Sequence, residues 1–152
     1  FAHAAEALVG KFIGAKDKTN LIKVIRLLFV WGVGISIPFS LIYLFAGNNL
    51  LYIITNNPDV ILAAAPYLFW IGIVPVITFA AFIWDGIYIG ATASAAMRNT
   101  LLISTILIFI PAYYLLRRPL ENHGLWLALM LFMMSRGLLL TIFAKRSIYK
   151  LI

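Results

Sequence analysis

Four side chains in this sequence are suited to acid–base or ion-pair chemistry: His3, Glu6, Asp85 and Arg136. Asp85 is the single carboxylate near the end of a long apolar run, and aromatic side chains flank it. A carboxylate inside lipid is costly, so one that lies there is a functional candidate. Its meaning therefore depends on whether the surrounding chain is embedded in a membrane.

The composition indicates that the chain is embedded in a membrane. Hydrophobic residues make up 64% of the chain and charged residues 11%, with a mean hydropathy of +1.02. Soluble domains are roughly half apolar and about a quarter charged. The chain has no Cys, which excludes disulfides and thiolate metal sites. Its net charge of +7 lies in the connections between apolar runs, which argues against a nucleic-acid partner.

We therefore predict an all-α, polytopic transmembrane bundle with about four full spans preceded by a truncated first helix. The first segment, Phe1 to Ala15, is shorter than the roughly 20 residues that a helix needs to cross a bilayer. We expect the chain to begin part-way along a transmembrane helix and to be a piece of a longer polypeptide. The four expected spans are about 21–46, 60–89, 100–116 and 125–144.

The connections carry recognisable start and stop signals. Gly47-Asn48-Asn49 is expected to end the second segment, and the short apolar patch 50–55 is suited to the membrane interface. Asn57-Pro58-Asp59 is typical of a helix start. The span after it is longer than a bilayer requires, so it is tilted, bent at Pro75 or extended past the interface. Two further connections are a small-residue linker at 91–99 and a polar loop at 117–124.

Basic residues orient the chain, because cytoplasmic loops of membrane proteins are enriched in Lys and Arg. Alternate connections share one side of the membrane, and that side holds most of the basic residues: Lys11, Lys16, Lys18, Lys23, Arg26, Arg98, Lys145, Arg146 and Lys150. The other side has only Arg117 and Arg118, beside Glu121. The C-terminus is thus predicted to be cytoplasmic.

Asp85 and Arg136 lie at matching depths. Counted from Arg98, Asp85 is on the order of 10 Å inside the basic boundary, and Arg136 is roughly 13 Å inside when counted from Lys145. An ion pair between the third and fifth segments would spare both charges isolation in lipid. Two interpretations stay open: a structural pair or helix-bend cap, and a site at which Asp85 binds a proton, a cation or a cationic substrate.

Glu6 is the second acidic candidate, about 15 Å from Lys16 and so near the membrane midplane. His3 precedes it by one helical turn and Gly10 follows it by one turn, which places all three on one side. His3 and Glu6 would then form a proton relay. The alternative is a carboxylate hydrogen-bonded to a neighbouring helix.

Other residues suggest helix packing, bends and a cavity. The pairs Gly10/Gly14 and Gly86/Gly90 match the Gly-x-x-x-Gly pattern, which favours close helix contact. Prolines within spans leave carbonyls free and bend helices, so the bend candidates are Pro38, Pro75 and Pro111. Aromatic residues are dense in the third segment, where either a ligand cavity or lipid contact would explain them. The cavity-lining candidates are Tyr67, Trp70, Phe82, Trp84 and Tyr88.

An enzyme is not expected. The chain has no His-Glu-x-x-His motif, no Cys and no Gly-rich phosphate loop, and its two histidines lie far apart. The other Asp residues, Asp17 and Asp59, lie in a loop or at a helix start. We therefore predict no catalytic residue and no metal ligand.

Several stretches together resemble one family of membrane transporters. They are Phe1–Gly10 closed by Gly14–Asp17, Trp84–Thr92, Met97-Arg98-Asn99, Leu125–Leu129 and Ser135-Arg136-Gly137. In this order and spacing they resemble the DNA-damage-inducible branch of the multidrug and toxic compound extrusion (MATE) transporters. The resemblance covers essentially the whole chain.

The resemblance implies a fold of twelve helices in two six-helix lobes, with this chain forming the C-terminal lobe from within helix eight to helix twelve. The N-terminal lobe of the same polypeptide would be its partner, beside membrane lipids. The family exports hydrophobic and cationic compounds by alternating access, driven by protons or sodium ions, and we favour protons. No other cofactor is implied. The expected location is the bacterial inner membrane.

The best-known coupling carboxylate of this branch lies in the first helix of the missing lobe, so no residue here corresponds to it. Glu6 and Asp85 match motifs of the second lobe. Two alternative functions remain: a lipid-linked flippase of the same superfamily, and a membrane scaffold that transports nothing. Buried ionisable groups favour transport over a scaffold.

Overall fold

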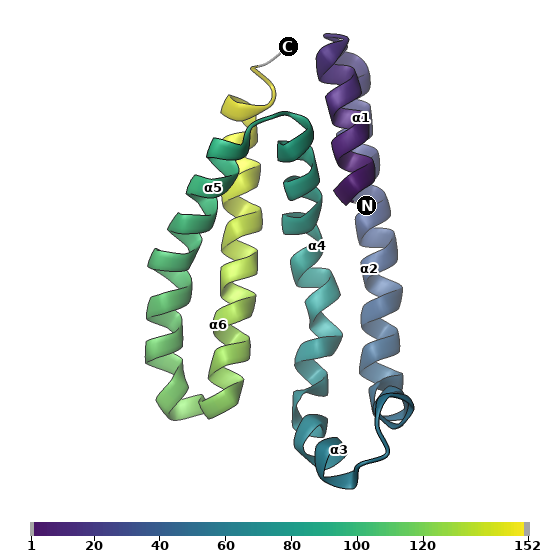
Figure 1. The fold of residues 1–152 in the computed structure, drawn as a ribbon, viewed down its shortest axis with the longest axis vertical. Helices are drawn as coiled ribbons and strands as arrows, with labels where there is room; N and C mark the ends of the chain where they lie inside the picture. The colour runs from purple at the N-terminus through teal and green to yellow at the C-terminus, as the bar shows by residue number, and fades with distance from the viewer. Residues whose placement is uncertain (1, 151–152) are drawn as a thin grey trace.

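The computed structural model describes residues 2–150, which form helices joined by short turns and contain no strand (Figure 1). The helices are α1 Ala2–Gly14, α2 Lys18–Ile54, α3 Pro58–Ala64, α4 Leu68–Gly90, α5 Ser94–Ile103 and α6 Ile110–Ser147. A 3₁₀ turn, Ala65–Tyr67, joins α3 to α4, and a π-helical segment, Ser104–Phe109, joins α5 to α6. The all-α prediction is confirmed, and Phe1 lies outside the described residues.

Three helical stretches are long and apolar enough to cross a membrane: Lys18–Ile54, Pro58–Gly90 and Ser94–Ser147. The last has 54 residues and reverses direction at Glu121, whose φ of 48° and ψ of −124° are not helical. It therefore makes two passes, which Figure 1 shows as a hairpin of α5 and α6. Together with α1, these passes match the predicted four spans and shorter first helix.

The hairpin is tighter than the predicted polar loop over residues 117–124. Helix continues on both sides of Glu121, so a single residue makes the reversal. Gly124 closes the turn, since a Cβ there would clash with the carbonyl oxygen of Leu116. The predicted linker at 91–99 is also shorter, because the amide of Ala93 donates to the carbonyl of Tyr88 at 2.9 Å and α5 begins one residue later.

The expected end of the second segment at Gly47-Asn48-Asn49 is wrong, because α2 continues to Ile54. Gly47 is buried, and a Cβ there would lie 3.1 Å from the side chain of Leu68. It is a packing position rather than a helix stop. The apolar patch at 50–55 is thus mostly the end of α2, whose last turns are seen end-on in Figure 1 and so point away from the rest of the helix.

The third apolar run breaks near Pro66 rather than at Pro75. Asn57 caps α3 as predicted, with its side chain accepting from the amide of Asp59 at 3.0 Å. The 3₁₀ turn around Pro66 then separates α3 from α4, and Pro75 lies inside the continuous α4. Pro38 likewise lies inside continuous α2, whereas Pro111 is the second residue of α6, just after the π-helical segment.

Helix α4 is central and packs against α1, α2 and α6. Its contact with α1 depends on glycine, as the Gly-x-x-x-Gly pattern predicted. A Cβ at Gly86 would clash with the backbone of Ala2, and one at Gly90 with the backbone of Glu6. A Cβ at Gly10 would lie 3.4 Å from the carbonyl of Gly90, whereas nothing lies within 4 Å of one at Gly14. Three of the four glycines therefore lie at this contact.

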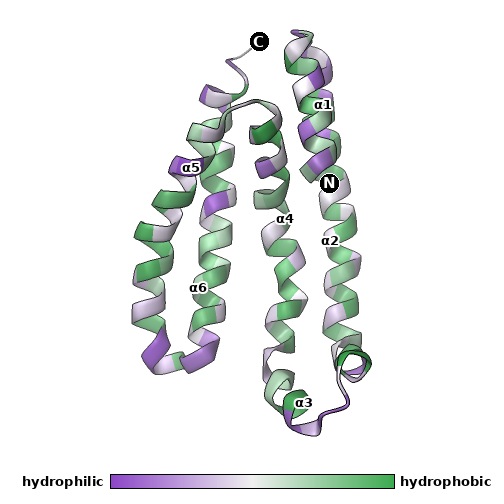
Figure 2. Cartoon of the chain, viewed as in Figure 1, coloured by the Kyte–Doolittle hydropathy of each residue, from purple (hydrophilic) through white to green (hydrophobic). Residues whose placement is uncertain are grey.

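Polar and apolar residues separate along the length of the bundle. In Figure 2 the middle of each long helix is largely hydrophobic, and hydrophilic colour gathers toward the two ends. Large apolar side chains such as Phe45, Leu107 and Leu138 are exposed on the outside. A surface of this kind is suited to lipid contact.

Candidate functional site

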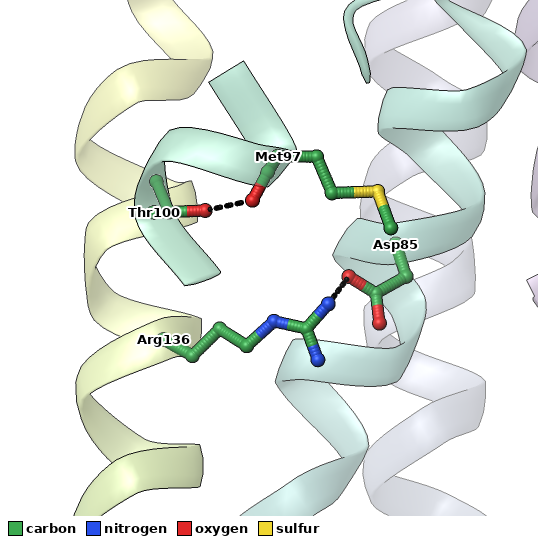
Figure 3. A network of polar contacts seen from close by, with 4 residues as sticks. All are labelled: Asp85, Met97, Thr100 and Arg136. Carbon is green, nitrogen blue, oxygen red and sulfur yellow. Dashed lines mark hydrogen bonds and ion pairs between the residues drawn. The ribbon is translucent and has the colours of Figure 1, made fainter. Parts of the chain in front are cut away.

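Asp85 and Arg136 form an ion pair between α4 and α6 (Figure 3). A terminal guanidinium nitrogen of Arg136 donates to Oδ1 of Asp85 at 2.7 Å. Both side chains are largely buried, with 15% of Asp85 and 11% of Arg136 exposed. The contact predicted from matching depths is thus present. Removing one partner of such a buried pair leaves the other charge uncompensated.

Helix α5 lies beside this pair. Figure 3 shows the side chain of Met97 extending toward Asp85, while the hydroxyl of Thr100 donates to the carbonyl of Met97 at 2.8 Å. The Nε of Arg136 is buried and has no hydrogen-bond partner among residues 2–150. The guanidinium therefore retains a donor that is not used by Asp85.

Two further hydrogen bonds join α4 to α6 near the pair. The indole N–H of Trp84 donates to the hydroxyl of Thr141 at 2.8 Å, and the hydroxyl of Tyr88 donates to the carbonyl of Leu140 at 2.7 Å. Trp84 is 4% exposed and Tyr88 is fully buried. Both were predicted to line a cavity, and this is wrong because α6 covers the face of α4 that carries them. Their two hydrogen bonds instead join α4 to α6 beside the Asp85–Arg136 pair.

Glu6 and His3 are arranged differently. Their side chains approach to 3.7 Å across one turn of α1, but His3 is fully exposed and Glu6 is 45% exposed. This distance is too long for a hydrogen bond. Because Ala2 contacts Gly86 and Glu6 contacts Gly90, Glu6 lies about one turn nearer the basic end than Asp85. The predicted order of depths is therefore reversed.

A mostly apolar cavity lies between α2, α4 and α6. Its volume is about 650 Å³, and its lining is mostly apolar, with a few hydroxyl groups. Phe82 and Pro75 line it, as do Ser36, Tyr43 and Thr78. Of the five aromatic residues proposed as cavity-lining, Phe82 is the one found here. Tyr67 lines a separate cavity at the other end, beside Asp59 and Asn122.

A second α4–α6 link was missed by the sequence analysis. The indole N–H of Trp70 donates to Nδ1 of His123 at 2.8 Å, and the ring of Tyr67 lies 4.9 Å from the imidazole. Trp70 was predicted to line a cavity, but it binds His123 and lines none of the cavities described here. His123 was predicted to lie in the polar loop at 117–124, so its position beside α4, two residues after the reversal at Glu121, was not anticipated.

No metal centre is formed by the described part of the chain. Among residues 2–150, no three His, Asp or Glu side chains converge on a position that would hold a metal ion. The chemistry of the site thus lies in one ion pair and its hydrogen-bonded surroundings.

The membrane-spanning helices and their buried ion pair define a polytopic membrane protein, and comparison with known families specifies its class. The MatE family model matches residues 1–115, so the chain belongs to this family of MATE-type transporters. The resemblance predicted from the sequence is confirmed.

A curated relative narrows the class further. The chain is 36% identical over 147 residues to DNA damage-inducible protein F of Escherichia coli (strain K12). This alignment covers 96% of the chain but only 31% of the relative, so the chain spans less than a third of that protein's length. No solved structure matches the chain.

Proposed function

We propose that this chain forms most of the C-terminal lobe of a cation-coupled multidrug efflux antiporter that works by alternating access. The N-terminal lobe of the same polypeptide would complete the substrate path. Family membership supports transport, and the 31% coverage of the relative supports a partner lobe outside this chain. The basic end and the C-terminus would face the cytoplasm of a bacterial cell, with the bundle in the inner membrane.

The observation that carries the proposal is the buried Asp85–Arg136 pair. An ionised Asp85 binds Arg136 at 2.7 Å and so holds α4 against α6. A protonated Asp85 would lose the charge attraction, and a cationic substrate would compete with Arg136 for the same carboxylate. A group with two states at a helix contact is able to shift the populations of two conformations. Glu6 and His3 would act as a second, more exposed pair of titratable groups.

Protons are favoured over sodium as the coupling ion. Sodium, like other hard cations, prefers several oxygen ligands, whereas a single carboxylate suffices for a proton. The described residues supply Asp85 with a guanidinium partner and no second carboxylate. The cavity of about 650 Å³ and its apolar lining suit hydrophobic or cationic compounds.

The test is efflux of a fluorescent hydrophobic cation from cells that express the intact gene. We expect faster efflux than from cells with empty vector, and loss of that efflux when the proton gradient is collapsed. Efflux that depends on a sodium gradient instead would overturn the choice of ion. No efflux at normal membrane expression would overturn the exporter and favour the flippase or the scaffold.

An exchange of charges tests the role of the pair. Asp85→Arg combined with Arg136→Asp should recover part of the transport that each single substitution removes. If the double variant is no better than either single variant, the interaction between the two residues is not what transport requires.

A further inference from the structure

A groove on the outside of the bundle combines one cation with an apolar strip. It lies between α2 and the segment that follows α6, and its volume is about 560 Å³. Its lining is Ile25, Arg26, Phe29, Val30 and Val33 of α2 together with Tyr149. It is separate from the Asp85–Arg136 site and plays no part in the function proposed above.

The lining residues are ordered along the helix. Arg26 lies eight residues after Lys18, where α2 begins, and is thus about 12 Å along the helix axis. Phe29 and Val30 lie one turn deeper and Val33 lies two turns deeper. The part of α2 before its last turns, residues 18–46, is about 43 Å long, which exceeds the roughly 30 Å of a hydrocarbon core, so the first turns of α2 extend beyond that core. The groove therefore has a cationic mouth at headgroup level and an apolar floor within the hydrocarbon.

Charge at this end of the bundle favours an anion. Arg26 is exposed and makes no ion pair with any carboxylate among residues 2–150. The connections at this end hold one acidic residue, Asp17, and nine basic residues. The basic residues are Lys11, Lys16, Lys18, Lys23, Arg26, Arg98, Lys145, Arg146 and Lys150. Asp17 is occupied as the cap of α2, where it accepts from the amide of Asn20 at 3.0 Å.

We propose that this groove binds one anionic phospholipid, with its phosphate on Arg26 and Tyr149 and an acyl chain along Phe29, Val30 and Val33. A guanidinium matches a phosphate with two parallel hydrogen bonds. Burial raises the pKa of the Tyr149 phenol, so the hydroxyl keeps its proton and is able to donate. The surrounding positive charge disfavours headgroups that carry an ammonium.

The headgroup test compares two substitutions of a basic residue by glutamine on α2 of the full-length protein. Binding of phosphatidylglycerol and phosphatidylcholine to the purified transporter is measured by native mass spectrometry. Arg26→Gln should weaken phosphatidylglycerol binding about tenfold, as expected for loss of a charged hydrogen bond. Lys23→Gln removes the same charge one turn earlier, outside the groove, and should change binding much less. Equal losses in the two variants would overturn a specific site and leave only general attraction.

The acyl-chain test fills the groove without changing charge. Val33→Trp should lower phosphatidylglycerol binding, whereas Leu27→Trp, at an exposed position that does not line the groove, should not. Should both variants bind like the parent, no acyl chain lies there. If a nitroxide on Val33→Cys is shielded from a lipid-phase relaxation agent, another part of the polypeptide covers the groove and the proposal is overturned.

Discussion

Helices α4 and α6 are joined in two places by contacts of different kinds. Toward the basic end, a charged pair links Asp85 to Arg136 and lies among the bonds of Trp84 and Tyr88. Toward the opposite end, a neutral hydrogen bond links Trp70 to His123 beside the ring of Tyr67. The first contact contains two charges whose separation is costly, whereas the second is one hydrogen bond at a partly buried position.

The difference indicates where the two helices would separate first. A lobe that rocks must keep some helix contacts and release others. Losing one charge at the Asp85–Arg136 contact changes its free energy by several times more than losing one partner at the Trp70–His123 contact. In the function proposed above, protonation of Asp85 would therefore act on the charged contact, whereas the Trp70–His123 contact, which requires an unprotonated Nδ1 of His123, would stabilise the hairpin end.

The largest loss of stability should follow from Arg136→Ala. It leaves Asp85 buried without a partner, which typically costs about 3–5 kcal/mol. Thermal unfolding of the purified full-length protein would measure the loss. Adding Asp85→Asn should recover a large part of it, because the unpaired charge is then gone. Arg98→Ala, at an exposed position, is the control and should change stability by about 0.5 kcal/mol or less.

Gly90→Ala should have the next largest effect, about 1–3 kcal/mol, because a Cβ there would clash with the backbone of Glu6 and displace α1. Gly14→Ala is the matched control from the other Gly-x-x-x-Gly pair, since nothing lies within 4 Å of its Cβ. The same unfolding assay applies to both variants. Equal effects at the two glycines would mean that α1 does not pack closely on α4.

His123→Phe should cost about 1 kcal/mol, because the indole N–H of Trp70 loses its acceptor at a partly buried site. Trp70→Phe should cost a similar amount, and the two substitutions together should cost less than their sum. Additive losses would show that the two side chains do not interact, so that the Trp70–His123 hydrogen bond does not join α4 to α6.

The smallest of these effects should come from Thr141→Val, at about 0.5–1 kcal/mol, because the indole N–H of Trp84 then lacks its acceptor. Among residues 2–150, the hydroxyl of Thr105 bonds to the carbonyl of Leu101 one turn earlier and to no other helix, so Thr105→Val should be nearly neutral. Fluorescence of Trp84 in otherwise Trp-free protein would report the lost hydrogen bond. An unchanged spectrum would argue against the bond.

The number of passes and the Asp85–Arg136 contact could be predicted from the sequence for the same reason. Rise per residue in a helix is constant, and basic residues mark a common boundary from which depth is counted. Asp85 and Arg136 lie on helices that meet that boundary at similar positions. The depths counted for the two residues therefore predicted correctly that they lie side by side. The same count, made from Lys16, predicted that Glu6 lies deeper than Asp85, which is wrong because α1 extends past the end of α4. The sequence does not encode this offset between the two helices.

The misplaced aromatic residues have a different cause. Trp84 and Tyr88 share one face of α4, but sequence alone does not say whether a cavity or another helix covers that face. The structure shows α6 there. His123 was missed because a run of polar residues after Arg118 suggested a long loop. The reversal instead takes place at Glu121 alone, which brings His123 back beside α4.

The proposed function requires that the charge on Asp85 takes part in transport and does more than hold α4 against α6. Its most direct test is efflux of a fluorescent cation from cells expressing the intact gene with Asp85→Asn, beside Asp59→Asn as a control at an exposed helix start. We expect Asp85→Asn to lose most of the efflux at unchanged membrane expression, whereas Asp59→Asn should keep it. Efflux by Asp85→Asn at the parental rate would contradict a role in transport and leave Asp85 with a structural role only.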